Sequence, residues 1–125
     1  MEENEPKSKS MLREKSFAFS VRIVKMSKFL VEEKREYIMS KQIIRSGTSV
    51  GANIEEAQNA ESDADFIHKL AIAQKEMGET LYWLRLLNAT EYLEKNHFDS
   101  IFGEAEEVAK MLTASLKTKK KNMKL

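Results

Sequence analysis

A stripe of small residues in the middle of the sequence limits how this chain can fold. Apolar and small side chains recur there at steps of three and four, which places them on one face of a helix: Met39, Ile43, Gly47, Val50, Ile54 and Ala57. A glycine inside a helix costs about 1 kcal/mol relative to alanine, so Gly47 and Gly51 predict a neighbouring helix that approaches closely. Because glycine and serine also mark loops, the alternative for residues 45–57 is a turn between two shorter helices.

The rest of the sequence predicts an all-α protein with one domain. Its 125 residues include one proline, at position 6, and four glycines, which leaves long stretches without a helix breaker. Apolar periodicity predicts four helices, at residues 10–33, 37–59, 62–87 and 98–117, the third of them capped by Ser62 or Asp63. Four such helices with short connections indicate an antiparallel up-and-down four-helix bundle. Residues 1–9 are then a disordered lead, and residues 118–125 are a basic tail.

Two of the predicted helices carry apolar side chains beyond those that a core needs. In residues 10–33 a second apolar stripe lies beside the core stripe and consists of Phe17, Val21, Val24 and Val31. A helix with this much apolar surface needs partners on two sides, and another subunit can supply one of them. In the third helix, Ile72, Trp83 and Leu86 lie off the core face and form either an interface or the edge of the bundle.

The sequence contains no pattern typical of an enzyme or a cofactor site. The absence of cysteine excludes thiol catalysis and cysteine-ligated metals. Asp65 and His68 have the spacing of half a di-metal site, but such a site needs two of these motifs, so we expect His68 to face solvent. Asn53 and Glu56 flank the central stripe, and we expect them to form hydrogen bonds across a helix–helix contact, not to catalyse a reaction.

Basic residues are the best functional candidates. The net charge is only +1, but lysine and arginine are concentrated near the two ends of the chain. Basic side chains bind phosphates without strict spacing. The candidates for phosphate contacts are Arg22, Lys25, Lys28, Lys41, Arg45, Lys117, Lys119, Lys120 and Lys121. The alternative is an ordinary solvated charged face. We expect a cytoplasmic protein, because the sequence shows neither a secretion signal nor an apolar run of membrane-spanning length.

The order of residues in the central stretch, Arg45-Ser-Gly-Thr-Ser-Val-Gly-Ala-Asn-Ile-Glu-Glu-Ala57, is also distinctive. With Ser40-Lys-Gln-Ile-Ile44 before it and Glu79-Thr-Leu-Tyr-Trp-Leu84 after it, the chain resembles the four-helix-bundle family of 23S rRNA intervening-sequence proteins. The resemblance implies a ring-like homopentamer without enzymatic activity. It extends to the accessory variability determinant of diversity-generating retroelements, a basic pentamer that engages nucleic acid and a reverse transcriptase. The nearly balanced charge of this chain departs from that branch.

The leading hypothesis from the sequence is a non-enzymatic homo-oligomer that binds RNA or another nucleic acid. Aromatic residues do not alternate with the basic residues along the chain, so the sequence predicts phosphate contacts and no reading of bases. The alternative is a scaffold or accessory subunit that binds a protein partner, such as a reverse transcriptase, through the Trp83 face or a central ring surface.

Overall fold

Four long helices make up nearly all of the structure. The computed structural model describes residues 7–123, with side chains from residue 11 onward. The helices are α1 (Lys7–Lys34), α2 (Met39–Ala57), α3 (Asp63–Ala89) and α4 (Lys95–Met123). No strand occurs among residues 7–123. Because α2 continues through both glycines, the predicted helix is confirmed, and residues 45–57 do not form a turn.

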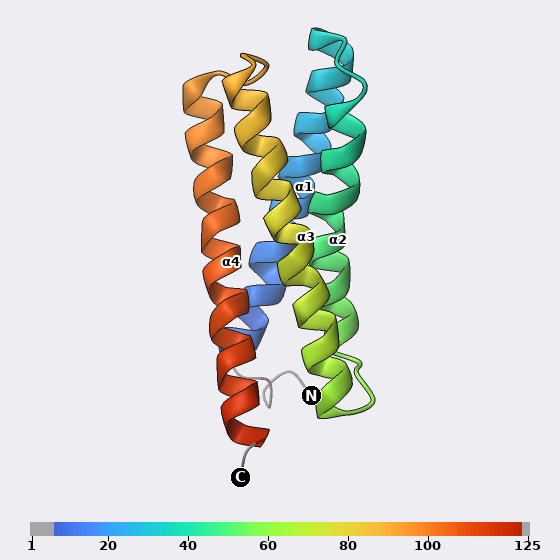
Figure 1. Ribbon diagram of the computed structural model, residues 1–125, viewed down its shortest axis with the longest axis vertical. Coiled ribbons are helices and arrows are strands. Elements are labelled where there is room, and N and C mark those ends of the chain that lie inside the picture. The colour runs from blue at the N-terminus through green and yellow to red at the C-terminus, as the bar shows by residue number, and fades with distance from the viewer. Residues whose placement is uncertain (1–6, 124–125) are drawn as a thin grey trace.

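The helices lie side by side along the long axis of the molecule (Figure 1). Each helix contacts the next one in the sequence, and α1 also contacts α4. Within the described part of the chain, the backbones of α1 and α3, and those of α2 and α4, do not approach one another as closely as those of neighbouring helices. The largest contact joins α2 to α3 and the smallest joins α1 to α4. The bundle is therefore tight around α2 and looser between its first and last helices.

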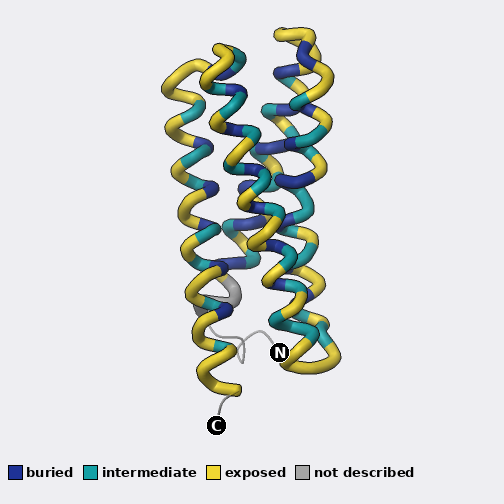
Figure 2. Tube along the Cα trace, viewed as in Figure 1, coloured by how far each residue is buried: buried dark blue, intermediate teal, exposed yellow. Residues whose placement is uncertain are grey.

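The core is built from the inward face of each helix. Figure 2 shows the buried positions on the sides of the helices that face one another. All four helices contribute side chains with no exposed surface, among them Phe19, Ile43, Leu84 and Leu112. Among them, Ile43 belongs to the central stripe that the sequence predicts. Burial of one large apolar side chain stabilises the folded state by about 1.5–3 kcal/mol, so this core supplies the main driving force for folding.

The second apolar stripe of α1 lies outside the core. Phe17 exposes 71% of its surface, Val21 38% and Val31 37%, whereas Val24 is half-buried. The described helices of this chain therefore leave Phe17, Val21 and Val31 exposed.

The glycines of α2 bring α1 close. A Cβ atom at Gly47 would lie 2.9 Å from the Ile23 side chain, and one at Gly51 would lie 2.7 Å from Ser20 Oγ and 3.3 Å from the Ser16 carbonyl oxygen. Nonbonded carbon atoms pack best at about 3.5–4 Å, so a side chain at either position would require the Ile23 or Ser20 side chain, or α1 itself, to move. The intrinsic cost of two helical glycines is thus offset by close packing of α2 on α1.

Small hydroxyl side chains complete the contacts of α2 on both flanks. Thr80 of α3 donates a hydrogen bond to Ser46 Oγ at 2.9 Å, and both residues are fully buried. Ser27 of α1 donates to the Ser40 carbonyl oxygen at 3.3 Å. These bonds satisfy polar groups that would otherwise be costly to bury.

A buried carboxylate organises the connection between α1 and α2. Glu36 is 7% exposed, and its side chain accepts backbone hydrogen bonds from Ile38, Met39 and Ser40 at 3.1, 2.9 and 2.8 Å. The first N–H groups of a helix have no partner inside it, so Glu36 caps α2. The sequence predicts that Glu36 lies in the connection between two helices, but it does not identify Glu36 as a cap. The residues that usually cap a helix are serine, threonine, aspartate and asparagine.

One predicted helix start is confirmed, and several other helix ends differ from the predicted ones. Ser62 caps α3, since its Oγ accepts a hydrogen bond from the Asp65 backbone N–H at 3.1 Å. α4 begins at Lys95 and continues past Lys117 to Met123, so the expected tail is helical as far as it is described. α1 includes residues 7–9 of the expected disordered lead. Residues 1–6 and 124–125 lie outside the described part of the chain.

Candidate nucleic-acid interface

Some of the cations predicted to bind phosphates are already paired with carboxylates. The Arg22 guanidinium donates to Glu104 Oε2 at 2.9 Å. Arg45 forms an ion pair with Glu76 at 3.3 Å and a second one with Glu79. The sequence could not show these pairs, because their members are far apart in the chain. Carboxylates at this distance offset the positive charge, so Arg22 and Arg45 offer less attraction to an anion than the sequence suggests.

Lys119 is also engaged within the bundle. Its Nζ atom lies 2.8 Å from Asp63 Oδ1 and 5.3 Å from the centre of the Phe66 ring. The ion pair and the cation–π contact hold the end of α4 against the start of α3. The role of Lys119 in this structure is therefore to attach α4 to α3.

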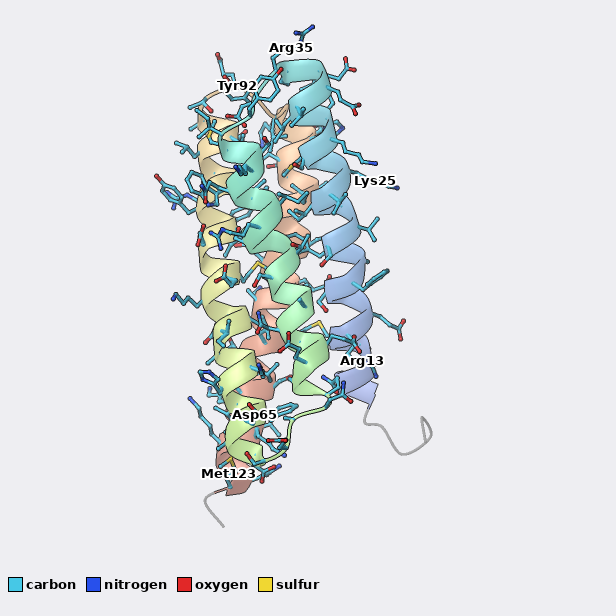
Figure 3. All side chains as sticks on the ribbon, turned by 90° about the vertical axis from the view of Figure 1, so that its right-hand side faces the viewer. Arg13, Lys25, Arg35, Asp65, Tyr92 and Met123 are labelled. Carbon is cyan, nitrogen blue, oxygen red and sulfur yellow. The ribbon has the colours of Figure 1, made fainter. Side chains whose placement is uncertain are left out.

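The remaining predicted cations are available to meet an anion. These lysines are exposed and form no ion pair with any residue of the described chain: Lys25, Lys28, Lys41, Lys117, Lys120 and Lys121. Figure 3 shows Lys25 directed away from the bundle. A lysine without an ion-paired carboxylate keeps more of its attraction for phosphate than a paired one, so the structure favours these six among the predicted cations.

The lysines at the end of α4 form an ordered basic surface. Lys117 and Lys121 are one helical turn apart on the same face, and Lys110, seven residues before Lys117, extends that face. Lys110 is exposed but is not among the phosphate-binding candidates predicted from the sequence, although the helical spacing of these lysines is visible there. The C-terminal end of a helix carries partial negative charge, which favours lysines there. We name Lys110, Lys117, Lys120 and Lys121 the α4 lysine surface.

Glu56 and Asn53 behave differently from one another. Glu56 of α2 accepts a hydrogen bond from Lys69 of α3 at 2.8 Å, which confirms the predicted bond across a helix–helix contact. The same bond raises the pKa of Lys69 above its ordinary value of 10.5. Asn53 donates only to Ser49, at 2.9 Å to its carbonyl oxygen and 3.1 Å to its Oγ. Within one chain, Asn53 therefore bonds to its own helix and not across a helix–helix contact, because a half-buried amide easily reaches the preceding turn.

The Trp83 face covers the edge of the core. Ile72, Trp83 and Leu86 are half-buried, and Trp83 packs against core residues. Its Nε1–H donates to Glu79 Oε2 at 3.0 Å, and its ring meets the Tyr82 ring edge-on with the centres 5.1 Å apart. Within one chain, the packing of Trp83 against the edge of the core thus explains its position.

The described residues offer no site for a metal ion. No cluster of three or more histidine, aspartate or glutamate side chains is arranged to hold one within residues 11–123. His68 is exposed, and Asp65 belongs to the cap of α3, where its Oδ2 accepts a hydrogen bond from the Glu61 backbone N–H at 3.4 Å. None of the four helices, over the part described, is both long and apolar enough to cross a bilayer.

Comparison with known proteins identifies the family. Residues 8–114 match the family described as 23S rRNA-intervening sequence protein. The chain belongs to this family. Its fold is similar to that of a solved protein of unknown function from the S23 ribosomal protein family of Bacteroides thetaiotaomicron, with 52% sequence identity and a TM-score of 0.87. That match covers 88% of this chain and 98% of the other. No curated protein matches the chain. The family that residues 45–57 resemble is thereby confirmed.

Proposed function

We propose that this member of the 23S rRNA-intervening sequence family is a cytoplasmic, non-enzymatic homo-oligomer that binds RNA or another nucleic acid. The observation that carries the proposal is the set of exposed lysines without carboxylate partners, above all the α4 lysine surface. A helix holds these lysine backbones at fixed spacing, so less conformational freedom is lost when they bind phosphates. The family description, which refers to 23S rRNA, supports RNA as the partner.

For the subunit we propose the antiparallel up-and-down course. Two ion pairs support it, because each joins the start of one helix to the end of another. Arg13, near the start of α1, lies 3.2 Å from Glu55, near the end of α2. Lys119, near the end of α4, lies 2.8 Å from Asp63 at the start of α3.

For the assembly we propose a ring of identical subunits, a pentamer by the family resemblance. The exposure of Phe17, with that of Val21 and Val31 on the same helix, supports self-association, because apolar side chains left exposed on soluble proteins can mark interaction sites. In a ring each basic patch is repeated around one axis, so the electric fields of the subunits add. This addition would raise phosphate attraction well above that expected from a net charge of +1 per chain.

A charge-matched pair of variants tests the nucleic-acid proposal. In the first, Lys117, Lys120 and Lys121 are replaced by glutamine. In the control, Lys15, Lys69 and Lys95 are replaced by glutamine; each of these lysines is already paired, with Glu107, Glu56 and Asp99 respectively. Both variants lose the same net charge. We expect the first to lose at least tenfold in affinity for an RNA hairpin by fluorescence anisotropy, and the control to lose much less. Equal losses would show that net charge alone, not the end of α4, sets binding.

A protein partner is the second candidate function. The exposed α1 stripe favours it, since the same apolar surface fits a different chain. An accessory subunit of a reverse transcriptase is the form that the family resemblance suggests. Replacement of Lys117, Lys120 and Lys121 by glutamine distinguishes the two functions, because it should weaken nucleic-acid binding and spare a protein partner on α1.

A further inference from the structure

A hollow with a mixed lining lies in the loosest part of the bundle, between α1 and α4. It measures about 230 Å³. Leu93 is buried there and Met26 and Phe29 are half-buried, while Lys25 and His97 are exposed. A second hollow of about 380 Å³ adjoins it and shares Phe29, Leu93 and His97. Binding sites for small planar groups typically combine an apolar floor with a few polar groups, and this surface has both.

The charges along the two hollows are unequal. Arg22 and Lys25 line the first hollow, whereas Lys34, Glu91 and Glu94 line the second, where Lys34 Nζ lies 5.8 Å from the centre of the Phe29 ring. Arg22 is held in place by Ser100 at 3.0 Å and by Glu104, and Lys25 has no ion pair within residues 11–123. An anionic group is therefore attracted chiefly to Lys25, and it is less favoured in the second hollow, where two carboxylates accompany one lysine.

Rings from separate parts of the chain line the two hollows. Phe29 comes from α1, His97 from α4, and Tyr92 from the connection before α4, where Figure 3 shows it at the same end of the bundle as Arg35. The sequence suggested no such mixture, because these residues are distant along the chain. Rings next to cations are how proteins bind single-stranded nucleic acid: the bases stack on the rings, and the cations bind the phosphates.

We propose that the hollow between α1 and α4 binds an unpaired nucleotide of an RNA strand. The base lies against Phe29 and His97, and its phosphate lies at Lys25, beside the Arg22–Glu104 ion pair. This inference rests on the proposed nucleic-acid function and narrows it. The α4 lysine surface attracts any phosphate backbone, whereas the hollow selects single-stranded segments whose bases are free to stack.

Two labelled probes of equal charge test the inference on the full chain. One is single-stranded oligoadenylate, and the other is an abasic strand of the same length. We expect the wild-type protein to bind oligoadenylate about tenfold more tightly, because only that probe offers bases for stacking. His97→Ala and Phe29→Leu should remove most of this preference while leaving the affinity for the abasic strand unchanged. Lys25→Gln should weaken both probes alike.

Matched controls replace the same residue types elsewhere on the surface. Tyr82→Leu removes an exposed ring from α3, and Lys75→Gln removes an exposed lysine of α3 with no ion pair among the described residues. Neither should alter the preference for oligoadenylate. Since His97 is exposed, its substitution leaves the fold intact even if Phe29→Leu lowers stability.

The outcomes separate this inference from the proposed function. Equal wild-type affinity for the two probes would overturn the nucleotide site and leave phosphate binding in place. A preference for oligoadenylate that survives both His97→Ala and Phe29→Leu would show that bases stack elsewhere, which also overturns the site. Failure of the wild-type protein to bind either probe or an RNA hairpin would remove the proposed function as well.

Discussion

At the scale of single residues, the glycines of this protein are of two kinds. Gly47 and Gly51 lie against α1, where a Cβ atom would meet other atoms at 2.9 and 2.7 Å. At Gly78 and Gly103, by contrast, an added Cβ atom would have open space, with no neighbouring atom within 4 Å. Only the first kind is explained by packing. The sequence distinguishes them in part, because Gly47 and Gly51 occur one turn apart on a stripe of small residues, whereas the other two are isolated.

Glycine substitutions should therefore change stability in opposite directions. Gly47→Ala should lower the free energy of unfolding, because the methyl group meets the branched side chain of Ile23, and Gly51→Leu should lower it further; overpacking costs about 1–3 kcal/mol or more. Gly78→Ala and Gly103→Ala should raise it by about 0.5–1 kcal/mol each through helix propensity. Urea denaturation measures all four. A stabilising Gly47→Ala would contradict the close contact between α1 and α2.

At the scale of the helix, apolar periodicity predicts which segments are helical but not where they end. The steps of three and four stop at Leu116, whereas α4 continues through lysines, which are good helix formers and need no apolar partner. The ends of α1 and α3 lack the glycine that commonly marks a helix end. Arg35 and Glu91 occupy the left-handed region there, with φ values of 54° and 68°. Such ends have no clear signal in a single sequence.

The start of α2 offers a prediction at this scale. Glu36→Ala removes a buried acceptor of three backbone N–H groups, so we expect a loss of about 1–3 kcal/mol in the free energy of unfolding. Glu33→Ala, in which the lost glutamate is exposed and lies in α1, is the control and should change stability by less than about 0.5 kcal/mol. Thermal denaturation followed by circular dichroism measures both. Equal, small effects would mean that solvent can replace the cap.

At the scale of the whole molecule, the sequence predicts the bundle and its family better than its site. Charge along the chain identifies Arg22 and Arg45, but their partners, Glu104 and Glu76, become neighbours only in the folded chain. The lysines without partners are likewise recognisable only from the fold. The sequence does predict the second apolar stripe of α1, because the helical spacing of these side chains can be recognised without the rest of the structure.

Self-association is the prediction at this scale. Phe17→Glu places a charge in the exposed stripe, where it costs a monomer little but would be buried in an oligomer. We expect the wild-type protein to have the mass of an oligomer by light scattering. Phe17→Glu should have a smaller mass, while its melting profile shows that each subunit is still folded. Tyr82→Glu, on α3, is the control and should keep the wild-type mass. An oligomer unaffected by Phe17→Glu would place the interface elsewhere.

The central claim is that lysines free of carboxylate partners bind phosphates, and the salt dependence of RNA affinity tests it most directly. The logarithm of the association constant for an RNA hairpin should fall linearly with the logarithm of salt concentration, with a slope of roughly 0.7–0.9 for each phosphate contacted. Replacement of Lys117, Lys120 and Lys121 by glutamine should make that slope shallower by roughly two to three. A flat salt dependence, or no binding even at low salt, would contradict the account.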